Sequence, residues 1–218
     1  MTQFLNIKNK KVVGVAVEVL NSGGVLVFPT ETAYGLAADA GSKKAIEKIY
    51  KIKGRMASKF LPLIVGSLKQ MQEFFELGEK ELELAKKHKG LTIILKIKNP
   101  RPRQAKRGGQ KSKIRKIYLL KGQNDCAVRI SKYKLARELA LKLGRPITAT
   151  SANVSGGENC YGLEEVTGQL KNIKTQPDLI IDGGRLKKRK PSTIVRVEGG
   201  KVEVVRRGEI KINSKVKT

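Results

Sequence analysis

The junction between two segments near the N-terminus constrains the fold more than any other feature of this chain. Residues 25–28 form an apolar run, Val-Leu-Val-Phe, which predicts a short buried strand. Residues 29–36 follow directly and read Pro-Thr-Glu-Thr-Ala-Tyr-Gly-Leu, with hydroxyl, carboxylate and phenol groups. Ligands of open α/β sheets bind where strands end. The junction therefore predicts a polar site at the edge of a sheet.

Apolar periodicity along the rest of the chain predicts a mixture of helices and strands. Helices are expected over residues 13–20, 43–53, 67–75, 79–88, 135–143 and 164–170, with Ser42 as an N-cap and Gly144 as a stop signal. Strands are expected over residues 61–65, 91–95, 127–130, 147–149 and 179–181, followed by a terminal hairpin of residues 193–197 and 201–206. The expected class is α/β, in one domain over residues 1–218.

Composition excludes several kinds of site and membrane segment. No apolar run approaches the roughly 18 residues that a membrane span requires, and residues 1–11 have no secretory apolar region. Cys126 and Cys160 form no CxxC pair, which favours a reducing cytoplasm over a disulfide framework. His88 is the only histidine and lies in a Lys-rich segment, so a zinc site and a Ser-His-Asp triad are both disfavoured.

Positive charge is abundant and unevenly distributed. The net charge is +27, from 46 basic and 19 acidic residues, which favours anionic partners. Residues 99–123 contain nine Lys or Arg and no acidic residue. This segment is either a solvated inserted loop or a nucleic-acid arm that contacts phosphates. The residues expected to contact RNA are Arg101, Arg103, Lys106, Arg107, Lys111, Lys113, Arg115 and Lys116.

Two further segments carry groups suited to phosphate binding. Lys53, Arg55 and Lys59 lie at and just after the end of an expected helix, where they either complement the helix dipole or form an anion cradle. Ser151 and Asn153 follow an expected strand, in either an ordinary turn or a ligand-binding loop.

Arg129 lies within the otherwise apolar run Ala-Val-Arg-Ile. A charged side chain in such a strand is costly unless it meets an anion, which indicates a substrate contact.

Four segments, in this order, resemble the YrdC-like family, whose enzymes make threonylcarbamoyl-adenylate for tRNA modification. They are residues 29–36, residues 53–63, residues 151–156 (Ser-Ala-Asn-Val-Ser-Gly) and residues 191–195 (Pro-Ser-Thr-Ile-Val). The resemblance extends from about residue 12 to residue 210. It implies a twisted open mixed sheet with flanking helices around a basic concave cleft, in the short form without an extra C-terminal domain.

The resemblance also implies residue roles. ATP would be bound by Lys53, Arg55, Lys59, Ser151, Asn153 and Arg206, with Lys53 and Arg55 at the reacting phosphates. L-Threonine and bicarbonate would be bound by Thr30, Thr32, Tyr34, Arg129 and Ser192. Mg²⁺ would be held mainly through the ATP phosphates, because no carboxylate cluster is evident. The product would pass to a separate threonylcarbamoyl transferase that acts on tRNA.

The chain departs from the family pattern at several positions. Gly66 stands where the family often has His, and Ser131 where it usually has Pro. These departures leave the nucleotide motifs intact and concern the amino-acid pocket. They keep open an alternative function, an RNA-binding YrdC-like protein without synthase activity.

Overall fold

The structure is a computed structural model that describes residues 2–54, 61–98, 117–118 and 124–212. Arg55, Lys59 and the basic residues expected to contact RNA lie outside these ranges. None of the helices within the described ranges has the length and apolar character needed to cross a membrane.

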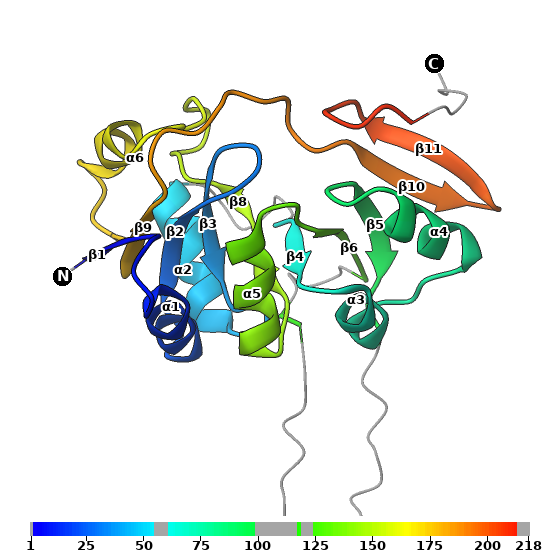
Figure 1. Cartoon of the computed structure of the whole chain (residues 1–218), viewed down its shortest axis with the longest axis horizontal. Coiled ribbons are helices and arrows are strands. Elements are labelled where there is room, and N and C mark those ends of the chain that lie inside the picture. The colour runs from blue at the N-terminus through cyan, green and yellow to red at the C-terminus, as the bar shows by residue number, and fades with distance from the viewer. Residues whose placement is uncertain (1, 55–60, 99–116, 119–123, 213–218) are drawn as a thin grey trace, which may run out of the picture.

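The first sheet, sheet A, has strand order β1-β9-β2-β3-β8 (Figure 1). Its strands are β1 (Gln3–Asn6), β9 (Leu179–Asp182), β2 (Val25–Pro29), β3 (Tyr34–Ala38) and β8 (Thr150–Ser151). Strands β1, β9 and β2 run parallel, whereas β3 is antiparallel to both β2 and β8. The polar loop of residues 30–33 therefore connects two adjacent antiparallel strands.

The second sheet, sheet B, has strand order β11-β10-β5-β6-β4-β7. Its strands are β11 (Lys201–Arg206), β10 (Ile194–Glu198), β5 (Thr92–Lys96), β6 (Asp125–Ile130), β4 (Leu63–Val65) and β7 (Ile147–Thr148). Because β7 belongs to sheet B and β8 to sheet A, residues 147–151 pass from one sheet to the other. Residues 183–193 also connect the sheets, as an irregular strap between β9 and β10 (Figure 1).

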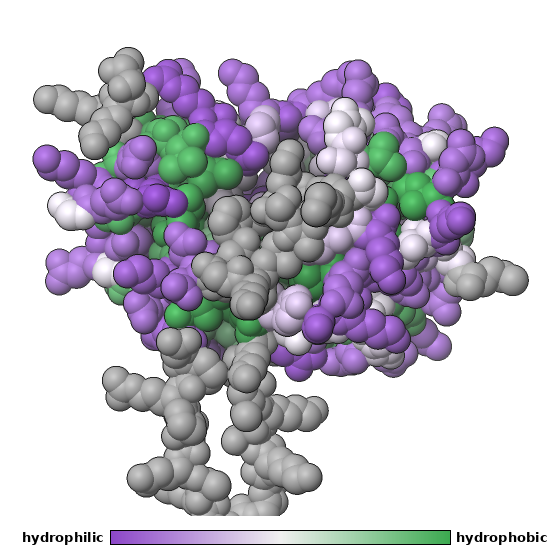
Figure 2. All heavy atoms as spheres, turned by 180° about the vertical axis from the view of Figure 1, so that it is seen from behind, coloured by the Kyte–Doolittle hydropathy of each residue, from purple (hydrophilic) through white to green (hydrophobic). Residues whose placement is uncertain are grey.

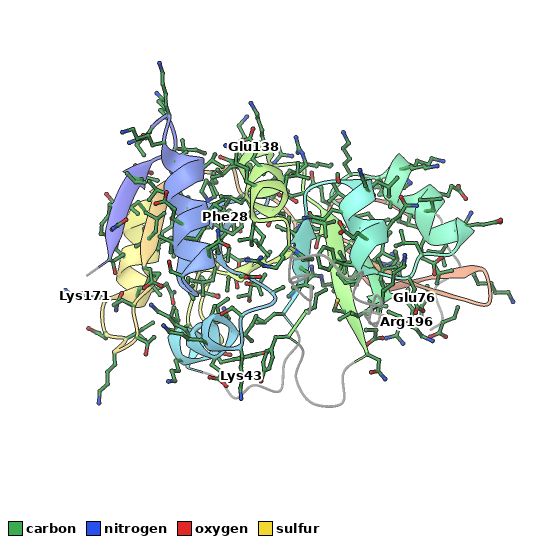
Figure 3. All side chains as sticks on the ribbon, turned by 90° about the horizontal axis from the view of Figure 1, so that it is seen from below. Phe28, Lys43, Glu76, Glu138, Lys171 and Arg196 are labelled. Atoms are coloured by element: carbon green, nitrogen blue, oxygen red, sulfur yellow. The ribbon has the colours of Figure 1, made fainter. Side chains whose placement is uncertain are left out.

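Helices cover both faces of sheet A because side chains alternate along its strands. Leu26 and Phe28 pack against α1 (Val12–Asn21) and α5 (Lys134–Leu143), and Figure 3 shows Phe28 between these helices. Val25 and Val27 pack on the opposite face, against α2 (Lys43–Lys53) and α6 (Leu163–Leu170). Sheet B has a separate apolar core with α3 (Leu68–Phe74) and α4 (Glu79–Lys87).

The surface is mainly polar. Hydrophilic side chains predominate among the described residues of the face in Figure 2, around smaller apolar areas. Among the described residues, the large hydrophobic side chains that are exposed belong to Phe4, Leu141 and Val205. This surface is consistent with the high positive charge of the chain.

The α/β class and the mixed sheet pairing are confirmed, and the strands are divided between two sheets. The expected helices form, and Ser42 Oγ accepts the Ala45 N–H at 3.3 Å as the predicted N-cap of α2. The terminal hairpin turns at Gly199 and Gly200, which both have positive φ. Strands β1, β3 and β8 were not predicted from the sequence.

Candidate active site

A cavity of about 360 Å³ lies between the two sheets. Sheet A contributes the β3 and β8 region, and sheet B contributes β5, β6, β10 and β11. The predicted site residues that line it are Thr30, Thr32, Tyr34, Arg129, Ser151, Ser192 and Arg206. Residues separated by up to 176 positions in the sequence thus meet in one place, as expected for a substrate site.

One row of residues across sheet B contributes four of the lining side chains. Strand register places Arg129 of β6 opposite Thr92 of β5, Thr92 beside Ile194 of β10, and Ile194 opposite Arg206 of β11. All four residues line the cavity. The row therefore places a guanidinium on each side of a hydroxyl and an apolar side chain.

Arg206 is bound to the strap through Ser192. Its Nη2 group donates to the Ser192 carbonyl oxygen at 2.8 Å and to the Ser192 hydroxyl at 3.1 Å. The Thr92 hydroxyl donates to the same Ser192 hydroxyl at 2.9 Å. Partial burial, and then the positive charge of Arg129, lower the pKa of Arg206. Two guanidinium groups that repel one another beside a cavity favour an anionic ligand.

Thr30 organises the loop that borders the cavity on the sheet A side. Its hydroxyl donates to the Ala33 carbonyl at 2.6 Å and accepts the N–H groups of Thr32 and Ala33 at 3.2 and 3.3 Å. The Thr32 hydroxyl is 3.1 Å from the Thr30 hydroxyl. Because Thr30 is buried and closes the loop, its main effect is to hold Thr32 at the cavity.

Tyr34 joins β3 to the start of the strap. Its hydroxyl donates to the Gly184 carbonyl at 2.8 Å and accepts the Gly183 N–H at 2.9 Å. Burial raises the pKa of Tyr34 above its ordinary value. The tyrosine therefore lines the cavity as a neutral phenol whose hydroxyl is engaged by the backbone.

Lys53 binds the end of β8 and the loop that follows it. Its ammonium group donates to the carbonyl oxygens of Ser151 and Asn153 at 2.8 and 2.9 Å, and to Asn153 Oδ1 at 2.9 Å. The Ser151 hydroxyl donates to Asn153 Oδ1 at 2.6 Å. Ser151 lines the cavity, whereas Lys53 and Asn153 do not. In this structure Lys53 thus contacts the predicted nucleotide-binding loop itself.

Gly66 does not line the cavity. A Cβ atom at this position would lie 2.3 Å from Leu141 Cγ and 2.5 Å from the Arg137 carbonyl oxygen. Helix α5 therefore packs directly against the Gly66 backbone, and a larger side chain has no room there. This departure from the family pattern is a packing contact with α5 in this chain.

Some lining residues were not assigned a role from the sequence. They are Ala33, Gly35, Pro62, Thr92, Ala149, Thr150, Asn159, Arg189, Pro191 and Ile194. Thr92 is the most informative of these, because its position follows from the pairing of β5 with β6 and β10. Strand register across a sheet has no local signal in the sequence.

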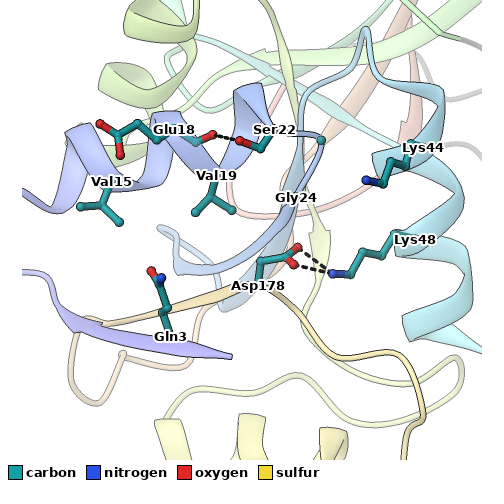
Figure 4. Close-up of a pocket in the computed structure, with 10 residues that line it drawn as sticks. Gln3, Val15, Glu18, Val19, Ser22, Gly24, Lys44, Lys48 and Asp178 are labelled. Carbon is teal, nitrogen blue, oxygen red and sulfur yellow. Dashed lines mark hydrogen bonds and ion pairs between the residues drawn. The ribbon is translucent and has the colours of Figure 1, made fainter. Parts of the chain in front are cut away.

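A second cavity, also about 360 Å³, lies between α1, α2 and the β9 region (Figure 4). Its main polar groups are Lys48 and Asp178, which form an ion pair at 2.7 Å. Asp178 Oδ2 also accepts the Val25 N–H at 2.7 Å. The first cavity, by contrast, is lined by the side chains of Arg129, Arg189 and Arg206 and by most of the site residues predicted from the sequence. The first cavity is therefore the candidate active site.

Other common kinds of reactive centre are missing from the described part of the chain. No group of three or more His, Cys, Asp or Glu residues there could hold a metal ion. Cys126 and Cys160 are free and buried, and burial raises their pKa to about 12 and about 11. These thiols are protonated at neutral pH and do not suit nucleophilic catalysis.

Comparison with known proteins shows the family to which this chain is related. The Sua5/YciO/YrdC family model, described as "Telomere recombination", matches residues 18–208. A threonylcarbamoyl-AMP synthase of Vibrio vulnificus is 30% identical over 178 residues, which are 82% of this chain and 89% of that protein.

Two solved structures share the fold. The crystal structure of P. abyssi Sua5 complexed with L-threonine has a TM-score of 0.76 and 27% identity, and covers 95% of this chain. This chain spans only 57% of that Sua5 chain. The crystal structure of E. coli YciO has a TM-score of 0.77 and 25% identity, and covers 98% of both chains. From the family model and the shared fold together, we conclude that this chain belongs to the Sua5/YciO/YrdC family.

Proposed function

We propose that this protein is an L-threonylcarbamoyladenylate synthase, a nucleotidyltransferase that uses ATP, bicarbonate and L-threonine. The observation that carries the proposal is the pair of guanidinium groups, Arg129 and Arg206, at one cavity with the hydroxyl groups of Thr32, Thr92 and Ser192. Such a site suits a substrate that carries both a carboxylate and a hydroxyl group. The V. vulnificus relative is named as such a synthase, and the P. abyssi structure contains L-threonine.

The proposed reaction has two steps. Bicarbonate takes up a proton and loses water to give CO₂. The threonine amine then attacks CO₂, which gives a carbamate and releases a proton, so that no net proton is gained or lost. A carbamate oxygen then attacks the α-phosphorus of ATP, and the bond from that phosphorus to the bridging oxygen breaks. Pyrophosphate leaves with the electron pair, and threonylcarbamoyl-AMP remains. Displacement of this kind needs alignment and charge neutralisation more than a protein nucleophile.

The residues of the cavity fit these steps. Arg129, Thr32 and Ser192 would hold threonine, with Thr30 and Tyr34 supporting the walls around it. Ser151, in the loop that Lys53 and Asn153 organise, would contact the nucleotide. Arg206 lies next to Ser192 and is electrostatically coupled to Arg129, so it would neutralise charge where carbamate and α-phosphate meet.

Mg²⁺ would enter bound to ATP. Glu31, between the lining residues Thr30 and Thr32, is paired with Arg129. No group of three or more His, Cys, Asp or Glu residues in the described part of the chain could hold a metal ion. This donor set fits a cation held by phosphate oxygens and water. Arg55 and Lys59 remain proposed phosphate ligands.

The product would serve a separate transferase that modifies the adenosine 3′ to the tRNA anticodon, giving N6-threonylcarbamoyladenosine. We expect this work to take place in the cytoplasm. The test is pyrophosphate release from ATP, with threonine and bicarbonate omitted in turn. Release that needs all three substrates supports the proposal, and release that ignores threonine contradicts it.

An RNA-binding role without synthesis is the second candidate. The observation that favours it is the charge of the chain, +27, with nine cations in residues 99–123. Under this alternative, the protein binds tRNA but does not exchange pyrophosphate into ATP. An ATP–pyrophosphate exchange assay in the presence of threonine and bicarbonate separates the two candidates.

A further inference from the structure

Glu31 connects the loop of sheet A to the end of β6 in sheet B. Its Oε2 atom accepts a hydrogen bond from the Ser131 hydroxyl at 2.6 Å. Its Oε1 atom lies 3.2 Å from Arg129 Nε. Glu31 does not line the cavity, although its neighbours Thr30 and Thr32 do. The carboxylate therefore meets Arg129 from outside the cavity.

The ion pair between Glu31 and Arg129 is well buried, so loss of the carboxylate would be energetically costly. The side chains of Arg129 and Glu31 are 8% and 14% exposed. Removing one partner of a buried pair leaves the other charge uncompensated in a poorly solvated place. Arg206 lies close enough for the Arg129 charge to lower its pKa. Without Glu31, Arg129 would lie near a second cation and would have lost the carboxylate that pairs with it.

The guanidinium of Arg129 is nevertheless left available to a ligand. A guanidinium has five N–H donors. Within the described part of the chain, Arg129 Nε and Glu31 Oε1 are buried without a hydrogen bond of good geometry. Arg129 lines the cavity, so its remaining donors are the ones that a bound anion can reach.

Ser131 secures the carboxylate. It is fully buried, and its hydroxyl also accepts the Tyr133 N–H at 3.1 Å. The Ser131 carbonyl oxygen accepts a hydrogen bond from Arg137 Nη1 of α5 at 2.8 Å. Ser131 is thus held by contacts on both its hydroxyl and its backbone. Because the same hydroxyl donates to Glu31, Ser131 also fixes the position of the Glu31 carboxylate.

We infer that Glu31 is a positioning residue that, held by Ser131, orients the Arg129 guanidinium so that its outer N–H groups receive the substrate carboxylate. The inference rests on the proposed function, because L-threonine is the ligand assigned to this cavity. Glu31 contributes charge and orientation through Arg129 and makes no contact with the substrate. An oriented guanidinium binds a carboxylate with less loss of conformational freedom.

Calorimetric titration of the folded protein with L-threonine tests this inference. Glu31→Gln keeps the shape of the side chain and removes its charge, and we expect it to weaken threonine binding about tenfold or more. Ser131→Ala should weaken binding less. The double variant should bind no worse than Glu31→Gln alone, because both changes act on one contact. The affinity for ATP should be unchanged in each. Glu83→Gln, which alters an exposed carboxylate paired with Lys80, is the matched control.

An NMR measurement on the ligand-free protein gives a second readout that does not depend on threonine. The Nε–H cross-peak of Arg129, assigned by its loss in Arg129→Lys, should be sharp in the wild type and broadened in Glu31→Gln. If Glu31→Gln binds threonine as tightly as the wild type or more tightly, and the cross-peak stays sharp, the inference is overturned. If the wild type binds no threonine, the proposed function fails, and the cross-peak comparison still decides whether Glu31 orients Arg129.

Discussion

Arg206 and Ser192 are joined by both the backbone and the side chain of the serine. Arg206 donates to the Ser192 carbonyl oxygen from Nε at 3.1 Å and from Nη2 at 2.8 Å, and to the hydroxyl at 3.1 Å. The contact joins the end of β11 to the strap, and both residues line the cavity. The position of the strap therefore determines where the Arg206 charge lies at the cavity.

Arg206→Lys should impair synthesis strongly even though it keeps the positive charge. A lysine ammonium cannot reproduce the planar fork that meets Ser192 from two nitrogens. We expect kcat/KM to fall about a hundredfold, the usual effect of removing one preorganised charge contact. Steady-state kinetics of Arg206→Lys beside Arg207→Lys measure this effect, because Arg207 is the next residue and does not line the cavity. Equal losses in both variants would mean that the contact with Ser192 is unimportant.

Lys53→Ala should reduce stability as well as activity. Lys53 is 3% exposed and donates to three oxygen atoms of the loop that carries Ser151. Its removal takes a charged donor away from all three acceptors, and only Asn153 Oδ1 keeps a second donor, the Ser151 hydroxyl. We expect a cost of about 3 kcal/mol in the free energy of unfolding. Urea unfolding measures the change, with Lys51→Ala on the exposed face of the same helix as control. If Lys53→Ala keeps wild-type stability, the loop does not depend on this ammonium group.

Gly66→Ala should be destabilising although the change is small. The added Cβ would fall 2.3 Å from Leu141 Cγ and 2.5 Å from a backbone oxygen of α5. Overpacking of this kind costs about 1–3 kcal/mol. Gly168→Ala in α6 is the matched control, because its Cβ meets nothing within 4 Å and alanine favours a helix. The Tm of Gly66→Ala should fall and that of Gly168→Ala should rise relative to the wild type. An unchanged Tm for Gly66→Ala would show that α5 can move to accommodate the added Cβ.

Tyr34→Phe should change how stability depends on alkaline pH. Burial raises the folded-state pKa of Tyr34 above its ordinary value of 10.0. A group with a raised folded-state pKa contributes stability that is complete below its unfolded-state pKa and is lost as pH rises through the folded-state pKa. The wild type should therefore lose more stability than Tyr34→Phe when the pH is raised above about 10. Denaturant curves of the two proteins at each pH measure the difference, and the contribution of the lysines cancels because both proteins share it. If the free energy of unfolding depends on pH identically in the two proteins, Tyr34 does not contribute in this way.

Only part of the segment of residues 99–123 should be dispensable for synthesis of the adenylate. Tyr118 lies within it, yet its N–H donates to the Ala40 carbonyl at 2.6 Å and its side chain packs beside the core. We expect deletion of residues 100–114, with Ile117 and Tyr118 retained, to leave pyrophosphate release near wild type. The same deletion should flatten the dependence of tRNA affinity on salt, because cations that contact phosphates are lost. An unchanged salt slope would show that these cations do not meet RNA.

Local patterns in the sequence were sufficient for much of the fold. Ser42 and the apolar face of residues 45–49 define α2, and two adjacent glycines define the terminal hairpin. Strand β3 was missed because Gly35 and two alanines have little intrinsic preference for strands, so its pairing with β2 and β8 is set by the surrounding structure.

The candidate site was predictable as a set of segments but not as a geometry. The row from Arg129 to Arg206 depends on register between strands that are far apart in the sequence. The contact of Glu31 with Ser131 depends on how the two sheets meet, which no single segment determines. Sequence periodicity places a residue on a face, whereas its partner on another sheet follows from packing.

The central claim is that the cavity joins threonine, bicarbonate and ATP in one adenylate-forming reaction. The most direct measurement is the rate of pyrophosphate release by the purified protein with Mg²⁺, ATP, L-threonine and bicarbonate, and with each of the last two omitted. The account predicts release that requires both threonine and bicarbonate, with threonylcarbamoyl-AMP formed in equal amount. Release that is the same without threonine, or no release in the complete mixture, would contradict it.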